Sequence, residues 1–557
     1  MPGSVTMSTF LYTLLGLTVG ASLHCSVRRE ISPCTCRLQE PTSNTILVAC
    51  ERMSSFTQVV DALRDKFPPD TDIALRIAYS HLDDFTNHSF QELGLAVTKL
   101  KLNHDNLSSL PESVFSGLGR TEYLSLADNS LPAVPQQVLR KMPVLKTLDI
   151  GRSQLQAITD ADFQQIPDLQ HLVLAGNDIS QLGHASMPHT LRHLHLGRNK
   201  LSHLNGTLRG LTELEWLFLN DNQLTTLDEQ LPQEGQKLAL LHAGNNLLQK
   251  MPQDIRNYNA IEALFLQNNE LPNLGGILQR ARKLKRLHLC HNNIRELSPD
   301  EFNELDSLED LQLGHNQLTS LNGSLLPLRS LRCLNLTNNL MEEFSLQEII
   351  GLRRLRIIDL SHNKISRLSG QLENLVEPET RIVELRLDYN LLHSLDGALM
   401  GVHGLQKLNL SNNLLENFAP DDLIGLEDLR ILDVSFNRLN TLEETSKTFL
   451  PSLEYLYASH NALTELKQDF HGLPSLCWAD LQDNFIQSIE QDLAAKTRCR
   501  MHGLPGTLKV FLSGNPVQCN AQLLETIAAM EANFTKLLGL AHCSPSNMTS
   551  VITASAA

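Results

Sequence analysis

The segment 191-LRHLHLGRNKL-201 decides the fold of this chain. It follows the pattern Leu-x-x-Leu-x-Leu-x-x-Asn-x-Leu, which returns about every 22 to 24 residues from Leu75 to Leu512. A unit of that length is too small to bury its own apolar side chains, so successive units must stack on their neighbours. The pattern therefore predicts a continuous solenoid.

One asparagine recurs in nearly every copy, and we call its place the ladder position. It is occupied by Asn177, Asn199, Asn222, Asn246, Asn269, Asn292, Asn316, Asn339, Asn363, Asn390, Asn413, Asn437, Asn461 and Asn484. Weaker copies around Ser80, Asp105, Asn129 and Ser153, with a last one at Asn515, bring the count to about nineteen repeats. An amide side chain both donates and accepts, so it can satisfy buried peptide groups where the backbone turns. Serine and aspartate do this less completely, which predicts less regular first repeats.

The Leu-x-Leu part of each copy predicts a short strand with its leucines inside and the intervening residues outside. Parallel strands from successive repeats then form one sheet. The expected fold is an α/β leucine-rich-repeat solenoid, a curved horseshoe with the sheet on its concave face and an irregular, 3-10 or helical convex side. Five phenylalanines are expected to fill the convex side: Phe90, Phe115, Phe163, Phe302 and Phe470.

The start of the chain indicates export. Residues 7–20 are apolar and short, and a small-residue site follows near Ala21, which is typical of a signal peptide. No later stretch has the roughly 20 apolar residues of a membrane span. We therefore expect a signal peptide at 1–21, a cysteine-rich N-terminal cap at 22–72, repeats at 73–515, and a C-terminal cap with a short tail at 516–557.

Most of the ten cysteines fall at the two ends of the array, where terminal repeats would otherwise expose apolar edges. The four N-terminal cysteines, Cys25, Cys34, Cys36 and Cys50, allow three pairings. Cys499 is expected to join either Cys519 or Cys543 in the C-terminal cap, with Cys477 as another candidate member. Cys290 and Cys333 are offset by two repeats and about 10 Å, too far for a disulfide, so both are expected to be free or used between chains.

The signal peptide, the four-cysteine cap, the repeat length and the segment 515-NPVQC-519 together resemble the extracellular leucine-rich-repeat superfamily. That group includes Slit, chaoptin, Toll-type receptor ectodomains, the acid-labile subunit and insect secreted repeat proteins. The resemblance covers nearly the whole mature chain, and it implies pairs Cys25–Cys36 and Cys34–Cys50. The chain departs from the group in having fewer cysteines in its C-terminal cap, and a Toll-type cytoplasmic domain is not expected.

Function is expected on the outward residues of the strands, which lie two, four and six places before each ladder position. In the first half these residues are aromatic and histidine-rich, and exposed aromatic strips mark binding surfaces. The candidate ligand-binding residues are His171, His193, His195, Trp216, Phe218, Leu240, His242, Phe265, Arg286 and His288. The alternative is a self-covered surface whose rings pack on one another and bind nothing. A second aromatic cluster, at Tyr455, Tyr457 and Trp478, is either cap packing or another contact.

The histidines allow two sharper hypotheses beside that of solvated side chains. A row of imidazoles could change binding on acidification, or could collect a transition metal. Strands lie about 4.8 Å apart, which is wide for one ion held by His195 and His242 two strands away, so no metal or other cofactor is expected. A recurring basic stripe is expected to be solvated charge, although it could touch a sulfated or acidic partner: Arg282, Lys285, Arg329, Arg332, Arg353 and Arg356.

Eight sequons offer glycosylation sites: Asn87, Asn106, Asn205, Asn322, Asn335, Asn409, Asn533 and Asn547. Asn335 and Asn409 fall in the central concave column. Glycans there would cover the second half of the concavity and direct a partner to the first.

The sequence contains no phosphate-binding glycine loop and no zinc-protease motif, and recurring text such as 361-SHN-363 is the repeat turn, so no enzyme is expected. The net charge of −16 argues against binding to nucleic acid. The predicted function is a secreted, glycosylated scaffold for an extracellular or cell-surface protein, with a homodimer as a further state. The alternatives are an adhesive or matrix-organising protein and a receptor ectodomain lacking its membrane span.

Overall fold

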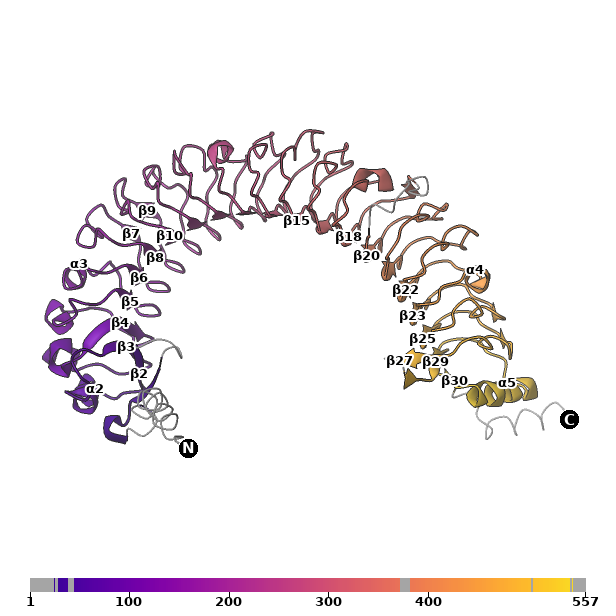
Figure 1. Ribbon diagram of the computed structural model, residues 1–557, viewed down its shortest axis with the longest axis horizontal. Helices are drawn as coiled ribbons and strands as arrows, with labels where there is room; N and C mark the ends of the chain where they lie inside the picture. Colours follow the sequence, from indigo (N-terminus) through magenta and orange to yellow (C-terminus); the bar gives the residue numbers. More distant parts are fainter. Residues whose placement is uncertain are drawn as a thin grey trace, which may run out of the picture. The chain divides into compact units, whose positions relative to one another are not determined.

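The computed structural model describes residues 25, 29–38, 45–370, 381–501, 504–540 and 543 (Figure 1). The expected signal peptide lies outside these residues. The chain divides into two compact units, 1–261 and 262–557, which are described separately. In each unit the strands line the inner side of a curved stack of turns, and short helices and loops form the outer side (Figure 1).

Unit 1 contains one main sheet and a small outer pair of strands. The main sheet opens with an antiparallel hairpin of β1 and β2 and continues in parallel, one strand per repeat. Its strands are β1 (Thr35–Leu38), β2 (Ile46–Glu51), β3 (Asp72–Ala78), β4 (Ala96–Asn103), β5 (Tyr123–Ser125), β6 (Thr147–Asp149), β8 (His171–Val173), β10 (His193–His195), β11 (Trp216–Phe218) and β12 (Leu240–His242). The outer pair is β7 (Ala157–Ile158) with β9 (Gln181–Leu182).

Unit 2 repeats this arrangement with a parallel main sheet. Its strands are β13 (Ala263–Phe265), β14 (Arg286–His288), β15 (Asp310–Gln312), β16 (Cys333–Asn335), β18 (Ile357–Asp359), β20 (Glu384–Arg386), β21 (Lys407–Asn409), β22 (Ile431–Asp433), β23 (Tyr455–Tyr457), β25 (Trp478–Asp480), β29 (Leu508–Phe511) and β30 (Thr535–Leu538). Smaller pairs are β17 (Glu343–Ser345) with β19 (Arg367–Ser369), β24 (Glu465–Leu466) with β26 (Ser488–Ile489), and the antiparallel β27 (Arg500–Met501) with β28 (Leu504–Pro505).

The helices are short and few. Those with bounds in the described part of the chain are α2 (Phe56–Leu63), α3 (Gln136–Leu139), α4 (Glu443–Lys447) and α5 (Ala521–Ala532). The 3-10 turns are η1 (Arg29–Ile31), η2 (Phe85–Asn87), η3 (Phe90–Leu93), η4 (Glu112–Phe115), η5 (Gln253–Asn257) and η6 (Leu346–Ile349). Ser55 caps α2 by accepting from the backbone N–H of Gln58, and Asn520 caps α5 by accepting from that of Leu523. Both caps satisfy amide donors that a helix start leaves unpaired.

The leucines of the repeat form the core. Leu194, Leu196 and Leu201 are 0% exposed, and equivalent leucines are buried in the other repeats. The phenylalanines expected behind the turns are also buried: Phe90, Phe115, Phe163, Phe302 and Phe470. The sequence-based solenoid with its parallel sheet is thereby confirmed.

The ladder asparagines join each repeat to its neighbour. The amide of Asn177 donates to the carbonyls of Ile150 and Leu174, at 2.8 and 2.9 Å. Its side-chain oxygen accepts from the backbone N–H groups of Ser153 and Leu155, at 3.0 and 3.2 Å. Four peptide groups are thus satisfied by one side chain in a place that water does not reach.

Of the three ladder residues that are not asparagine, Asp105 and Ser153 leave atoms unsatisfied, whereas the Ser80 hydroxyl accepts from the backbone N–H of Met53 and donates to the carbonyl of Ala78. Asp105 is 5% exposed, and its Oδ1 accepts from the backbone N–H of Ser80 at 2.8 Å. Its Oδ2 and the hydroxyl of Ser153 are buried without a hydrogen-bond partner. Burial raises the pKa of Asp105 from 3.8 to about 7, against the opposing bond from Ser80.

Four disulfides close the ends of the array. At the N-terminus the pairs are Cys25–Cys36 and Cys34–Cys50, as the family resemblance implied. Near the C-terminus Cys519 pairs with Cys543, and Cys499 pairs with Cys477. The expectation that Cys499 joins Cys519 or Cys543 is therefore wrong. Cys477 directly precedes β25, which pairs with β29, and the segment between these two strands brings Cys499 back to it, with their alpha carbons 4.8 Å apart. Cys290 and Cys333 are free thiols.

Candidate protein-binding surface

The candidate residues of unit 1 meet on neighbouring strands. β8, β10, β11 and β12 pair in parallel, so His171, His193, Trp216 and Leu240 stand side by side in one row. The His193 ring stacks on the Trp216 indole with centroids 4.0 Å apart and planes 2° apart. Trp216 is nevertheless 45% exposed. We call His171, His193, His195, Trp216, Phe218 and His242 the ring patch.

His171 and His193 are coupled through one hydrogen bond, since their Nδ1 atoms lie 2.8 Å apart. At this distance one ring must donate and the other accept, so the two facing nitrogens share a single proton. Burial lowers the pKa of both histidines. The positive charge of Arg192 lowers the pKa of His171 further, and the charge of His171 lowers the pKa of His193. Glu215, 3.8 Å from Nε2 of His193, opposes both shifts. The pair is therefore favoured in its neutral state.

The second row of the ring patch is made in the same way. His195 meets Phe218 edge-on at 4.9 Å, and Phe218 meets His242 edge-on at 6.3 Å. Burial lowers the pKa of His195, which Asp149 opposes. The rings thus cover part of one another's surface but leave their edges and the Trp216 indole facing outward.

The remaining candidates, Phe265, Arg286 and His288, form a separate cluster in unit 2. Phe265 and His288 meet at right angles with centroids 4.7 Å apart, and the Arg286 guanidinium lies 5.9 Å from the Phe265 centroid. His288 also lies 3.0 Å from Asp310, and this contact helps to lower the pKa of the Asp310 carboxyl against the effect of burial. Each candidate is therefore placed on an outward strand position of its own unit.

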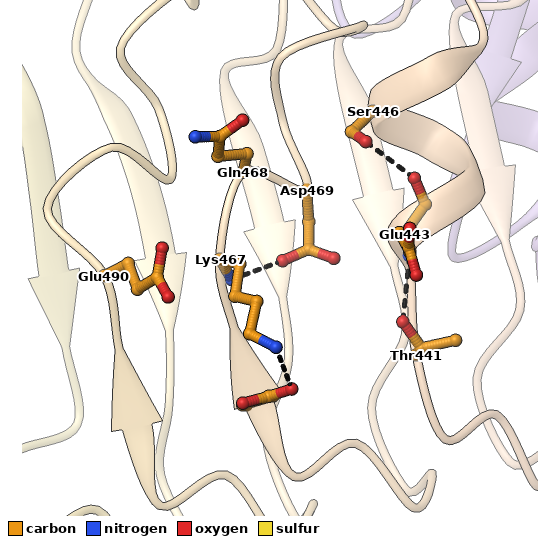
Figure 2. Close-up of a pocket in the computed structure, with 8 residues that line it drawn as sticks. Thr441, Glu443, Ser446, Lys467, Gln468, Asp469 and Glu490 are labelled. Carbon is orange, nitrogen blue, oxygen red and sulfur yellow. Dashed lines mark hydrogen bonds and ion pairs between the residues drawn. The ribbon is translucent and has the colours of Figure 1, made fainter.

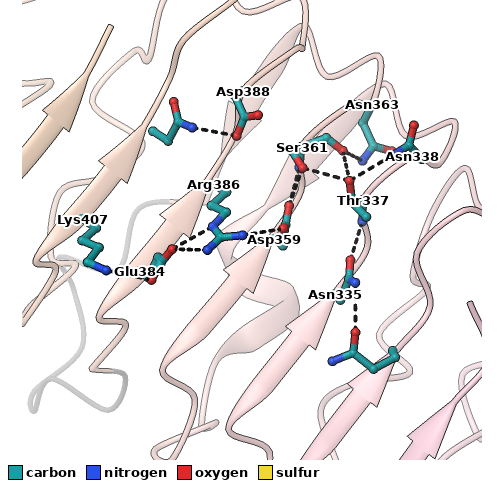
Figure 3. Close-up of polar contacts among 12 residues, drawn as sticks. Asn335, Thr337, Asn338, Asp359, Ser361, Asn363, Glu384, Arg386, Asp388 and Lys407 are labelled. Atoms are coloured by element: carbon teal, nitrogen blue, oxygen red, sulfur yellow. Dashed lines mark hydrogen bonds and ion pairs between the residues drawn. The ribbon is translucent and has the colours of Figure 1, made fainter. Parts of the chain in front are cut away.

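Farther along unit 2 the outward side chains form a polar network (Figure 3). Arg386 contacts Glu384 at 2.6 Å and Asp359 at 3.4 Å, and Lys407 lies 3.6 Å from Glu384. Asn335 donates to Gln312 at 2.9 Å and accepts from the backbone N–H of Thr337. These charges and amides are largely used by one another, so this stretch offers less exposed apolar area than the ring patch.

The sequons differ in accessibility. Asn335 and Asn409 are half-buried and hydrogen-bonded within the network, Asn409 through Asp388. Exposed sequon asparagines lie elsewhere: Asn87, Asn106, Asn205, Asn322 and Asn533. Asn547 lies outside the described residues. None of these asparagines belongs to the ring patch.

The other features singled out in the sequence have local partners. Three members of the basic stripe, Arg282, Lys285 and Arg332, pair with glutamates at 2.8, 2.8 and 3.6 Å. Trp478 of the second aromatic cluster packs on Phe511 at 4.2 Å, which favours cap packing. Tyr455 in β23 is the register partner of Trp478 in β25, so the two residues lie side by side on neighbouring strands.

An open cleft on unit 2 is lined mainly by acidic and amide side chains (Figure 2). Lys467 contacts Glu465 at 2.5 Å, and Asp469 accepts from the Lys467 backbone N–H at 2.7 Å. Burial raises the pKa of Asp469. The cleft contains hydroxyls but no histidine or cysteine, and its polar atoms serve the local turn.

Sequence reading did not single out the residue directly before each ladder asparagine. In unit 2 this place holds rings in six repeats: His291, His315, His362, Tyr389, Phe436 and His460. All six have positive φ, and they stack in pairs at 3.9 to 4.2 Å. Comparing the residue before the ladder position across successive repeats would have revealed this row of rings.

We predict that protonation of the histidine pair changes the fluorescence of Trp216. In a Trp478→Phe variant only Trp216 remains, and the imidazolium form of the stacked His193 should quench it. Because burial lowers the pKa of both histidines, the midpoint should lie below pH 6.5. A pH titration of emission measures it. His193→Gln should abolish the transition and His184→Gln, away from the patch, should keep it; a midpoint above 6.5 would contradict the geometry.

Comparisons with known proteins agree with the fold. The leucine-rich-repeat family model matches residues 120–179, 282–341, 380–439 and 427–486. Human podocan-like protein 1 is 31% identical over 158 residues, covering 27% of this chain and 30% of that protein. Human Toll-like receptor 3 is 31% identical over 86 residues, covering 15% and 10%. The chain thus spans less than a third of these relatives.

Among solved structures, Drosophila Toll in its glycosylated complex with Spatzle is similar in fold, with a TM-score of 0.64 and 18% identity. The match covers 92% of this chain and 70% of Toll. The chain therefore has the fold of a leucine-rich-repeat solenoid, and the family model recognises its repeats. More narrowly, its repeats are similar in sequence to stretches of podocan-like protein 1, lumican and Toll-like receptor 3, each over less than half of that protein. Within the described residues no helix is long and apolar enough to cross a membrane.

Proposed function

We propose that this chain is a secreted, glycosylated scaffold that binds an extracellular or cell-surface protein through the ring patch of unit 1. The observation that carries the proposal is the 45% exposure of Trp216, held flat against His193 in a row of rings. Tryptophan is one of the residue types enriched in binding hot spots, and exposed apolar patches mark interaction sites. Four disulfides and exposed sequons support an extracellular setting.

The mechanism of binding is rigidity. The ring patch stands on strands that are fixed by parallel pairing and by ladder asparagines such as Asn199 and Asn222. Ring stacking fixes the side chains as well. A surface ordered before the encounter loses little conformational entropy on binding, so more of the contact energy appears as affinity.

The second candidate function is that of an adhesive or matrix-organising protein. The similarity to podocan-like protein 1 and to rat lumican, 29% identical over 156 residues, favours it. An adhesive protein would coat cells or matrix, whereas the scaffold proposed here would form a defined complex with one partner.

Affinity capture from extracellular fluid and from cell-surface extracts separates these functions. The bait is the full chain, beside a Trp216→Ala, Phe218→Ala double variant and a Phe449→Ala control, since Phe449 is 65% exposed outside the strands. We expect a defined partner whose affinity falls about 1,000-fold in the double variant only, because two hot-spot rings contribute about 2 kcal/mol each and about 1.4 kcal/mol is tenfold in affinity. A partner that both variants retain would place the binding surface elsewhere.

A further inference from the structure

The edge of unit 2 that carries the residues before the ladder positions is exposed and apolar in its middle. Tyr389 and Phe436 are each 50% exposed, and Leu391 and Phe485 are 45% and 61% exposed. The rings lie in two stacked pairs, His362 on Tyr389 at 4.2 Å and Phe436 on His460 at 4.1 Å. Stacking covers one face of each aromatic ring and leaves the remainder to solvent.

The backbone conformation at two of these rings is unfavourable for a bulky side chain. Tyr389 and Phe436 both have φ of 54°, in the left-handed region that bulky residues rarely adopt. Asparagine adopts it readily and occupies the same place in neighbouring repeats, at Asn338 and Asn412. Strained exposed residues point to a function beyond the turn itself.

The order of residues along this edge is symmetric about Asn412. The seven residues before the ladder positions run Asn338, His362, Tyr389, Asn412, Phe436, His460, Asp483. Read from the centre in either direction, the edge gives an aromatic ring, then a histidine, then a small polar side chain. The residues after the ladder positions add Leu340 at one end, Leu414 at the centre and Phe485 at the other.

We infer that this edge is a self-complementary interface through which two copies of the chain form a two-fold dimer. A two-fold contact places the same surface on both copies in opposite directions, so its residues must match their own reversed order. With the axis at Asn412 and Leu414, Tyr389 of one copy lies opposite Phe436 of the second copy, and Leu340 opposite Phe485.

Charge is compatible with this pairing. The chain has a net charge of −16, which opposes self-association over most of its surface. Between Asn338 and Phe485 the two columns hold one carboxylate, Asp483, and it lies 3.4 Å from His460. In the reversed order Lys364 faces Ala462 and Arg438 faces Leu391, so no like charges meet.

Sedimentation velocity from about 0.1 to about 50 µM tests the dimer. The wild-type chain should move towards twice the monomer mass, and a Tyr389→Asn, Phe436→Asn double variant should dimerise about 100-fold more weakly. Asparagine relieves the backbone at both positions, so folding is preserved; Phe449→Ala serves as the control. A wild-type chain that stays monomeric throughout, or a double variant that dimerises equally, would overturn the inference.

Cross-linking tests the position of the axis. In a Cys290→Ser, Cys333→Ser background, Leu414→Cys lies at the axis and faces its own copy, so mild oxidation should give covalent dimers. Leu391→Cys, which is more exposed, faces Arg438 and should give none. Equal cross-linking by both variants would overturn the two-fold register. The ring patch lies on a different unit, so either outcome leaves the proposed function to its own test.

Discussion

Asp105→Asn should raise the free energy of unfolding of the N-terminal repeats by as much as about 4 kcal/mol at pH 8. In the equivalent repeat, the amide of Asn129 donates to the carbonyls of Leu102 and Leu126 at 2.8 and 2.9 Å. A carboxylate cannot donate, and Oδ2 of Asp105 is buried without a partner. Asparagine supplies the missing donor and removes a buried charge.

The pH dependence fixes the sign of this effect. The fold raises the pKa of Asp105 from 3.8 to about 7. The contribution of protonated Asp105 to the free energy of unfolding is therefore fully present below pH 3.8 and is lost as the pH rises towards 7. Thermal unfolding at pH 8 and pH 4 should show a large gain for Asp105→Asn only at pH 8. Asp128→Asn is the control, because the hydrogen bond from Arg152 lowers the pKa of Asp128. Replacing that carboxylate should therefore lower the stability of the fold at pH 8. Equal gains at both pH values would contradict the explanation.

Asn177→Ala should destabilise its repeat by about 4 kcal/mol. The substitution removes four hydrogen bonds and leaves the peptide groups of Ile150, Ser153, Leu155 and Leu174 short of partners. Urea unfolding followed by hydrogen exchange in these residues measures it. Asp178→Ala is the matched control, since Asp178 is half exposed and pairs with Lys200 on the surface, a contact worth under about 1 kcal/mol. Similar losses from both substitutions would show that the ladder contributes little.

The fold was predictable because its determinants are local and repeated. Each copy carries its own strand, turn and ladder residue, so the burial of Leu194 or Asn199 follows from the pattern alone. The position of each candidate ring on the sheet was predictable for the same reason. Register along parallel strands is fixed once the ladder positions are known.

The sequence could not predict contacts that depend on side-chain geometry. The shared proton of His171 and His193 follows from ring orientation rather than from spacing. The Cys477–Cys499 pair was missed because an insertion before β29 returns the chain to the previous strand. The edge rings lie outside the strands, in left-handed turns whose side chains also point outward, so the strand alternation does not reveal them.

The most direct test of the central claim is the emission of Trp216 in the Trp478→Phe variant when the captured partner is added. Trp216 is 45% exposed in the free chain. If the partner covers the ring patch, the indole leaves water and its emission should shift to shorter wavelength, in proportion to complex formed. Unchanged emission while the complex assembles would show that the partner binds elsewhere and would contradict the account.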